Sequence, residues 1–209
     1  GGDRVQGLKQ VEKASAEGTL FPAVAKMMLV DIYSQYEGRG TEAAKLAEQL
    51  HQQYPTNDEL TFSLAGIIGG PLIEDRARAA EVYAGLIERR RSDKTTEGAK
   101  SYYNAVLALA QLKRDEWRVE DAIATLTPII DSKVTTPDWV MPQYLLRRAS
   151  YRTTLNDPAA EDDAKRVAND PQMAGSKAAA ENLIKQIAER RTSGEATTMA
   201  ALIPGNRLT

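Results

Sequence analysis

The stretch AVAKMMLVDIYSQYEGRGTEAAKLAEQLHQQYP, from Ala23 to Pro55, decides the fold of this chain. It holds two short amphipathic segments, and a break containing Gly38 and Gly40 separates them. Apolar residues recur in both segments at the spacing of one helix face. The stretch therefore predicts a helical hairpin, and the rest of the chain reads as looser copies of it.

The same signals continue along the chain and predict an all-α protein. Period-two alternation of β-branched and aromatic residues, which is typical of strands, is missing from the sequence. Thr41, Asp157 and either Asn57 or Asp58 are expected to cap helices, and Pro128 predicts a kink or an early helix end. The ten predicted helices cover residues 3–16, 22–37, 41–54, 57–69, 74–91, 99–113, 119–130, 137–155, 158–170 and 176–191.

Composition excludes several classes of protein. Hydrophobic residues make up 42% of the 209 residues, enough for a sizeable core, whereas aromatic residues make up only 6%, so Ala and Leu dominate the packing. The net charge of -2 argues against a general nucleic-acid binder. The absence of Cys excludes disulfides and thiolate metal sites and fits an oxidising or a reducing compartment. No run of about 18 apolar residues predicts a transmembrane segment.

An internal repeat links the second helices of four successive hairpins. Each begins its apolar face with Ala, continues four residues later with a small, aromatic or aliphatic residue, and ends three residues after that with an aliphatic one. A small residue lets two helices approach closely, and the aliphatic residue fills the space towards the next hairpin. The four sets are Ala43, Ala47 and Leu50; Ala79, Tyr83 and Leu86; Ala122, Leu126 and Ile129; and Ala160, Ala164 and Val167.

This pattern resembles the tetratricopeptide repeat (TPR) family over about residues 20–170. The stretch from Ala43 to Pro55 is the most similar, Tyr83 supplies an expected aromatic residue, and Pro171 lies near a terminal proline position. The aligned alanines are 36, 43 and 38 residues apart, so loops are longer than in the family, and its signature Trp and Gly are not evident. An irregular helical bundle with coincidental Ala spacing is the alternative.

The resemblance implies a right-handed α-solenoid of TPR-like hairpins with a C-terminal capping helix. It implies one repeat domain over residues 1–192 and an irregular tail over residues 193–209. It also implies a bacterial protein, of a kind that is often exported or lipid-anchored. Gly1-Gly2 is typical of a trimmed start, so a periplasmic or exported location and a cytoplasmic one both stay open.

In such arrays the first helix of each hairpin lines the concave surface, which is the usual binding face. We therefore expect a groove that binds a peptide or a partner helix. For the two arginines among its predicted residues, an equally supported alternative is that their long side chains lie along a packed face. The predicted partner-binding residues are Asp31, Asn104, Gln111, Arg148 and Arg152.

Catalysis is not expected. His51 is the only histidine, which leaves no pair for a metal site, and no glycine frame of a nucleophile elbow surrounds any serine near it. The sequence thus predicts a non-catalytic protein-binding scaffold without metal, cofactor or nucleic acid. Two alternatives stay open: a self-associating structural module, which Leu202 and Ile203 would favour, and a repeat section of a larger exported protein.

Overall fold

The computed structural model describes residues 3–18 and 21–193. Within these ranges the regular structure consists of ten α-helices and one short 3-10 helix, without strands, so the all-α prediction is confirmed. No helix in the same ranges combines the length and apolar character that a membrane span requires. The predicted tail, with Leu202 and Ile203, lies outside the described residues from residue 194 onward.

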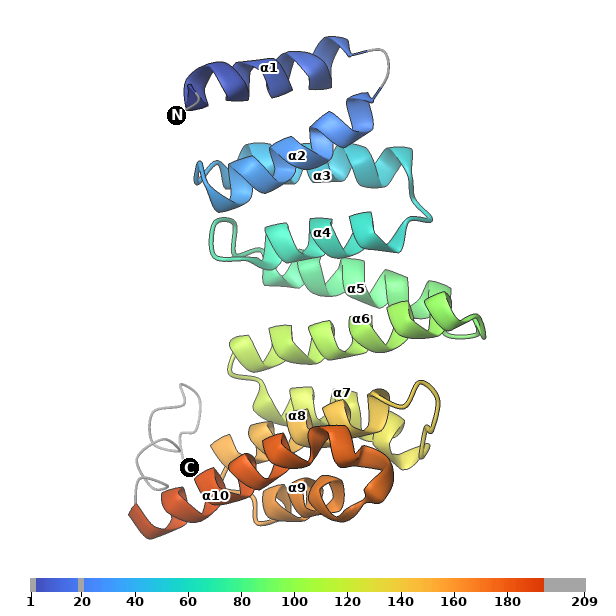
Figure 1. The fold of residues 1–209 in the computed structure, drawn as a ribbon, viewed down its shortest axis with the longest axis vertical. Coiled ribbons are helices and arrows are strands. Elements are labelled where there is room, and N and C mark those ends of the chain that lie inside the picture. Colours follow the sequence, from blue (N-terminus) through green and yellow to red (C-terminus); the bar gives the residue numbers. More distant parts are fainter. Residues whose placement is uncertain (1–2, 19–20, 194–209) are drawn as a thin grey trace, which may run out of the picture. The chain divides into compact units, whose positions relative to one another are not determined.

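The chain forms two compact units, residues 1–89 and residues 90–209, and the boundary falls at the C-terminal end of α5. Within each unit, helices that follow one another in the sequence lie side by side, which is a helical-repeat-like arrangement (Figure 1). The single repeat domain expected over residues 1–192 stays a prediction. The first unit contains α1 (Arg4–Glu17), α2 (Pro22–Gln35), α3 (Gly40–Gln53), α4 (Asp58–Gly69) and α5 (Arg76–Arg90). The second contains α6 (Thr96–Asp115), α7 (Val119–Asp131), α8 (Val140–Thr154), α9 (Ala159–Asn169), the 3-10 helix η1 (Pro171–Ser176) and α10 (Lys177–Ser193).

The core of the first unit is built by successive helix pairs. Leu29 and Tyr33 of α2 and Ala43 of α3 form a buried cluster, and partly buried aliphatic side chains from α1, α3 and α4 pack against it. Phe62 of α4 and Tyr83 of α5 continue the packing, with their ring centroids 5.7 Å apart. Each helix therefore buries its apolar face against its sequence neighbours.

The second unit also packs in sequence order, and in addition α6 contacts α8 and α8 contacts α10. Tyr144 of α8 is fully buried, and its hydroxyl donates a hydrogen bond of 2.7 Å to the carbonyl oxygen of Tyr103 on α6. The ring of Tyr103 meets the rings of Tyr144 and Trp139 edge to face, at centroid distances of 6.2 and 6.4 Å. These contacts place the first helices of two successive hairpins next to each other.

The alanine repeat of the sequence corresponds to the buried faces of α3, α5, α7 and α9. All four leading alanines and the residues four positions after them are buried, as are Leu50, Leu86 and Val167. The prediction for Ile129 is wrong, because Ile129 is half-buried and Ile130 takes the core position. Positions seven and eight after Ala122 both border the same helix face, so spacing alone does not choose between them.

Helix ends follow the predicted capping signals in part. The Asn57 side chain accepts from the backbone N–H of Leu60 at 3.2 Å, and the Asp157 carboxylate accepts from that of Ala159 at 2.9 Å. Thr41 is not a cap, because α3 already begins at Gly40, where a Cβ would lie 2.6 Å from the Cβ of Leu72. This glycine therefore serves close packing rather than the break between two helices.

The proline in α7 does not end the helix. Pro128 lies in its last turn, and α7 continues to Asp131. The carbonyl oxygen of Pro128 accepts from the backbone N–H of Ser132 at 3.1 Å, which satisfies one of the carbonyls at the helix end. The early end, one of the two outcomes expected at Pro128, is therefore wrong, and the kink stays a prediction.

Candidate partner-binding surfaces

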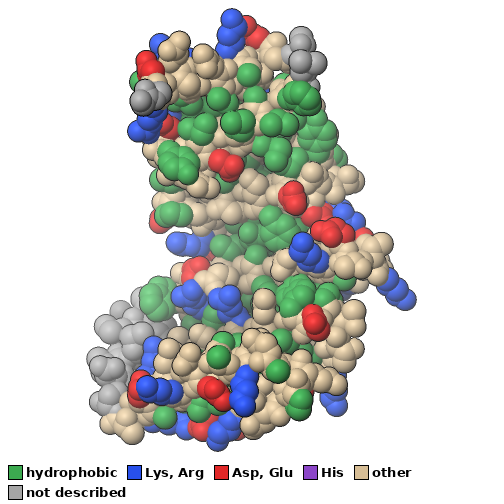
Figure 2. Space-filling model, viewed as in Figure 1, with side chains coloured by type: hydrophobic (Ala, Val, Ile, Leu, Met, Phe, Trp, Pro, Cys, Tyr) green, Lys and Arg blue, Asp and Glu red, His purple; other side chains and the backbone are tan. Residues whose placement is uncertain are grey.

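The exposed face of α2 is unusually apolar. Val24, Met27 and Met28 are 51%, 44% and 49% exposed, although the opposite face of the helix is buried in the core. Asp31 lies one turn after Met27 and Met28 on the same exposed face. Figure 2 shows the hydrophobic side chains that gather over α1 and α2. We call Val24, Met27, Met28 and Asp31 the α2 stripe.

A groove of about 510 Å³ lies between α1 and the C-terminal end of α2. Leu8 and Ile32 supply apolar walls, and Tyr36, whose side chain is 70% exposed, flanks the opening. The guanidinium of Arg4 donates to the Glu37 carboxylate at 2.8 Å across the two helices. The apolar surface of the first unit therefore contains a groove, and the Arg4–Glu37 ion pair lies at the edge of this groove.

A polar network behind the α2 stripe ties α2 to its neighbours. The hydroxyl of Tyr33 donates to the Glu12 carboxylate at 2.6 Å, and the guanidinium of Arg39 donates to the same oxygen at 3.3 Å. Arg39 also lies 3.9 Å from the centroid of the Tyr33 ring and donates to Glu42 at 2.9 Å. This network fixes the orientation of α2 relative to α1 and α3.

The same network shifts two pKa values in opposite directions. The hydrogen bond from Tyr33 lowers the pKa of Glu12 below its usual value, because it stabilises the charged carboxylate. Burial, together with the hydrogen bond to Glu12, raises the pKa of Tyr33. At neutral pH, Glu12 is therefore an anion and Tyr33 a neutral donor.

In the second unit, Gln111 connects α6 to α8. Its side-chain oxygen accepts from the guanidinium of Arg147 and from the hydroxyl of Tyr151, both at 3.1 Å. Its side-chain nitrogen donates to the carboxylate of Asp115 at 3.0 Å. Arg147 is exposed and its guanidinium donates to Gln111, so a cation lies on the outer face of α8.

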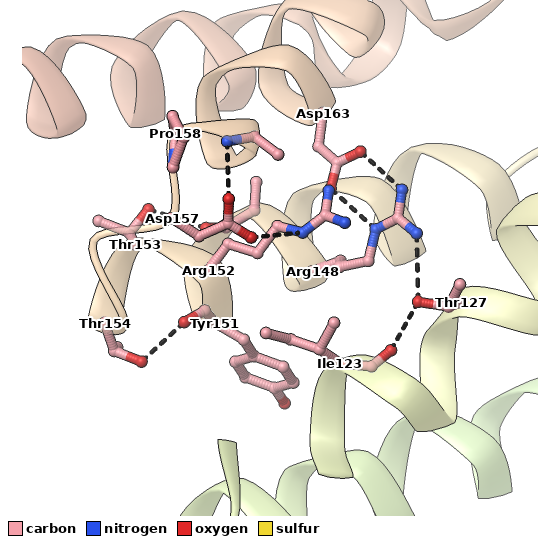
Figure 3. A network of polar contacts seen from close by, with 12 residues as sticks. Ile123, Thr127, Arg148, Tyr151, Arg152, Thr153, Thr154, Asp157, Pro158 and Asp163 are labelled. Atoms are coloured by element: carbon pink, nitrogen blue, oxygen red, sulfur yellow. Dashed lines mark hydrogen bonds and ion pairs between the residues drawn. The ribbon is translucent and has the colours of Figure 1, made fainter. Parts of the chain in front are cut away.

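Two arginines of α8 converge on one carboxylate of α9 (Figure 3). Arg148 donates from Nε and Nη2 to the two oxygens of Asp163, both at 2.8 Å, and from Nη1 to the hydroxyl of Thr127 on α7 at 3.2 Å. Arg152 donates from Nη1 to Asp163 at 2.7 Å, and its Nε lies 3.2 Å from the Asp157 carboxylate. We call Arg148, Arg152 and Asp163 the α8–α9 lock.

The predicted binding residues thus fall into different environments. Asp31 is exposed and its carboxylate has no polar partner among the described residues, and Asn104 is half-buried without a side-chain hydrogen bond in the same set. Gln111 bridges two helices, whereas Arg148 is buried and shares Asp163 with Arg152. The structure brings the two arginines together at the Asp163 carboxylate, which pairs with both of them.

The sequence analysis did not predict three of the exposed side chains that are suited to binding a partner. Met27, Met28 and Arg147 were not among the predicted binding residues. For α2, the signal is that apolar residues occur on both sides of the helix. Packing against the core accounts for only one of these sides. For Arg147, no local signal separates it from its neighbour Arg148, because most of the circumference of α8 is buried.

The environment of the histidine and the grouping of acidic side chains bear on metal binding. The only histidine, His51, lies with Nδ1 3.3 Å from the hydroxyl of Thr61, which also accepts from Arg89 at 3.3 Å. In residues 3–18 and 21–193 there is no group of three or more acidic or His side chains that could hold a metal ion. His51 therefore takes part in a local contact between α3 and α4.

Comparison with known proteins identified no similar protein. Family models, curated proteins and solved structures were all searched, and none of the three comparisons gave a match for this chain.

Proposed function

We propose that this chain is a non-catalytic, TPR-like α-solenoid module that binds a peptide or a partner helix on the exposed faces of its first helices. The observation that carries the proposal is the α2 stripe, an apolar surface on the first helix of a hairpin. The buried alanines of α3, α5, α7 and α9 support the repeat interpretation. The exposed Arg147, which donates to the half-buried Gln111, extends polar binding chemistry to the second unit.

The chemistry of the α2 stripe defines its ligand. Three adjacent apolar side chains, each at least 44% exposed, gain free energy when a partner removes them from water. The two methionines have flexible, polarisable side chains, which adapt to different apolar partners. Asp31 has no cation near its carboxylate among the described residues, so a Lys or Arg of the partner would complement it. The preferred ligand is therefore an amphipathic peptide with apolar residues and one adjacent cation.

Self-association is the second candidate function. Val5 of α1 and Phe21 at the start of α2 are 64% and 70% exposed, and they enlarge the apolar surface beyond the α2 stripe. A patch of this kind buries equally well against a second copy of the chain. Light scattering over a range of protein concentrations separates the two functions, because only self-association raises the mass with concentration.

A displayed library of random 16-residue peptides tests the peptide-binding function. We expect selection on the immobilised chain to enrich sequences with apolar residues at helical spacing and one Lys or Arg beside them. Asp31→Lys should then favour peptides with Asp or Glu at that place, because it reverses the charge that the ligand meets. Met28→Glu should weaken the selected peptides at least tenfold, since it puts a charge into the apolar contact.

Glu59→Lys is the matched control, because Glu59 is an exposed acidic residue of the same unit that lies on α4. It makes the same charge change as Asp31→Lys and should leave the consensus unaltered. Peptides that bind wild type, Met28→Glu and Asp31→Lys with equal affinity would exclude the α2 stripe as the binding surface. A library that yields no consensus would contradict peptide binding itself.

A further inference from the structure

Two irregular connections of the second unit meet at one polar pocket of about 190 Å³. One is the segment 132–139 between α7 and α8, and the other runs from the end of α9 into η1. Neither is part of the regular helix pairs, and connecting segments of this kind carry binding sites more often than packed helices do. The pocket is lined by Lys133, Val134, Thr135, Asp138, Met141, Pro142, Arg166, Asp170, Gln172 and Met173.

Three charged side chains of this pocket have no polar partner among the residues that the structure describes. Lys133, Asp138 and Arg166 are exposed, and none of them makes an ion pair or a side-chain hydrogen bond with another described residue. In contrast, the carboxylate of Asp170 accepts from the backbone N–H of Gln172 at 2.9 Å and thereby caps η1. Two free cations and one free carboxylate consequently share a single small pocket.

The remaining lining is apolar. Met141 and Pro142, at the start of α8, are buried, and Val134 and Met173 are half-buried. The pocket therefore offers an aliphatic and thioether surface beside charges of both signs. A ligand that matches it carries an anionic group, a cationic group and a short apolar part.

We propose that this pocket binds a small zwitterion, an α-amino acid with an apolar side chain. Lys133 and Arg166 would hold the carboxylate, Asp138 would hold the ammonium, and the side chain would rest against the two methionines. The volume fits this size, because it corresponds to about six water molecules in the liquid. The site is separate from the α2 stripe and lies in the other unit, so it does not depend on the proposed peptide binding.

Isothermal titration of wild-type protein with leucine and three analogues tests the assignment without any variant. Leucine should bind saturably. N-acetyl-leucine, which lacks the ammonium, and leucinamide, which lacks the carboxylate, should each bind at least tenfold more weakly, since each leaves a charged pocket group unpaired. A short peptide ending in leucine keeps the carboxylate but not the nearby ammonium, and should behave like N-acetyl-leucine. Equal or tighter binding of that peptide would overturn the amino-acid assignment.

Variants then locate the site. Arg166→Gln and Lys133→Met should each weaken leucine at least tenfold, whereas Asp138→Asn should weaken leucine and leave N-acetyl-leucine unchanged. Lys94→Met, an exposed lysine of the same unit outside the pocket, is the matched control and should bind leucine as wild type does. All four variants should melt at the wild-type temperature, because the side chains are exposed. Absence of saturable leucine binding by wild type up to about 10 mM would overturn the proposal.

Discussion

Asp163 and Arg148 form a two-pronged ion pair between α9 and α8, with both donor–acceptor distances at 2.8 Å and both side chains buried. The geometry is the parallel fork that guanidinium and carboxylate groups favour. Arg152 adds a third bond to the same carboxylate at 2.7 Å. Two cations therefore share the Asp163 carboxylate, and Asp157, 3.2 Å from the Nε of Arg152, supplies a second negative charge.

Removal of the Asp163 carboxylate should destabilise the folded protein. We expect Asp163→Asn to lower the free energy of unfolding by about 3 kcal/mol, because it leaves the buried Arg148 cation without its counter-charge. Urea denaturation followed by far-UV circular dichroism measures the change. The neighbouring Asp162 is exposed, so Asp162→Asn is the control and should change stability by less than about 0.5 kcal/mol. Equal effects of the two substitutions would mean that the α8–α9 lock does not form.

The packing register of α7 gives a second test. Ile130 is 2% exposed, whereas Ile129 is only half-buried. Ile130→Ala should therefore cost about 3 kcal/mol through lost burial and a residual cavity, and Ile129→Ala should cost clearly less, about 1 kcal/mol. Thermal and urea unfolding of both variants decide the order. The reverse order would restore the register that the repeat pattern predicts.

Two glycines should respond in opposite ways to the same substitution. Gly40→Ala places a methyl group 2.6 Å from the Cβ of Leu72 and should destabilise the protein by about 1 kcal/mol, although Ala favours helices. Gly85 lies on α5 with open space around its Cα, so Gly85→Ala should stabilise by up to about 1 kcal/mol. A pair of melting curves measures both effects. Stabilisation by Gly40→Ala would show that α3 and the segment after α4 are not in contact.

The Tyr33–Glu12 hydrogen bond should appear in the pH dependence of stability. The pKa of Glu12 is lowered in the folded state, so its contribution is present above the usual carboxyl range and is lost as the pH falls through the lowered pKa. Tyr33→Phe removes the hydroxyl donor. We expect the stability difference between wild type and Tyr33→Phe to be larger at neutral pH than at a pH below the lowered pKa of Glu12, where Glu12 is protonated in both proteins.

Urea titrations at the two pH values give this difference directly. Tyr36→Phe is the control, because Tyr36 is 70% exposed and its hydroxyl makes no hydrogen bond with the described residues. It should show no pH-dependent difference from wild type. A constant difference for Tyr33→Phe at both pH values would contradict a hydrogen bond from Tyr33 to the charged Glu12 carboxylate.

Local physics explains why the helices could be predicted and parts of the surface could not. The Gly, Pro and Asn residues that start and end helices, and the spacing of the alanines, are local signals that depend on neighbouring residues only. These signals located ten helices to within a few residues. The environment of Arg148 depends on Asp163, which is 15 residues away on another helix, so periodicity could not reveal that it is buried. One step of about 100° along α8 separates it from the exposed Arg147.

The α2 stripe shows the opposite difficulty. Apolar residues on both sides of α2 predict burial on both sides, and the pattern alone does not identify the side that a neighbouring helix leaves uncovered. Asn104 and Asp31 were predicted from their helical position, and their accessibility agrees with a surface location while their role in binding stays a prediction. Which surface meets a partner depends on that partner, and therefore lies beyond the sequence of this chain.

The α8–α9 lock is contained in a single hairpin, since its three charged residues all lie between residues 148 and 163. The Asp157 carboxylate, which pairs with Arg152, lies in the same hairpin, so the segment carries two cations and two carboxylates and keeps its charge balance wherever it is inserted. Duplication or transplantation of this hairpin would therefore preserve the compensation, whereas exchange of either helix alone would strand a charge in an apolar interior. The unit that can be duplicated or exchanged at this end of the chain is thus the helix pair α8 and α9. The charged residues of the two helices are expected to change together.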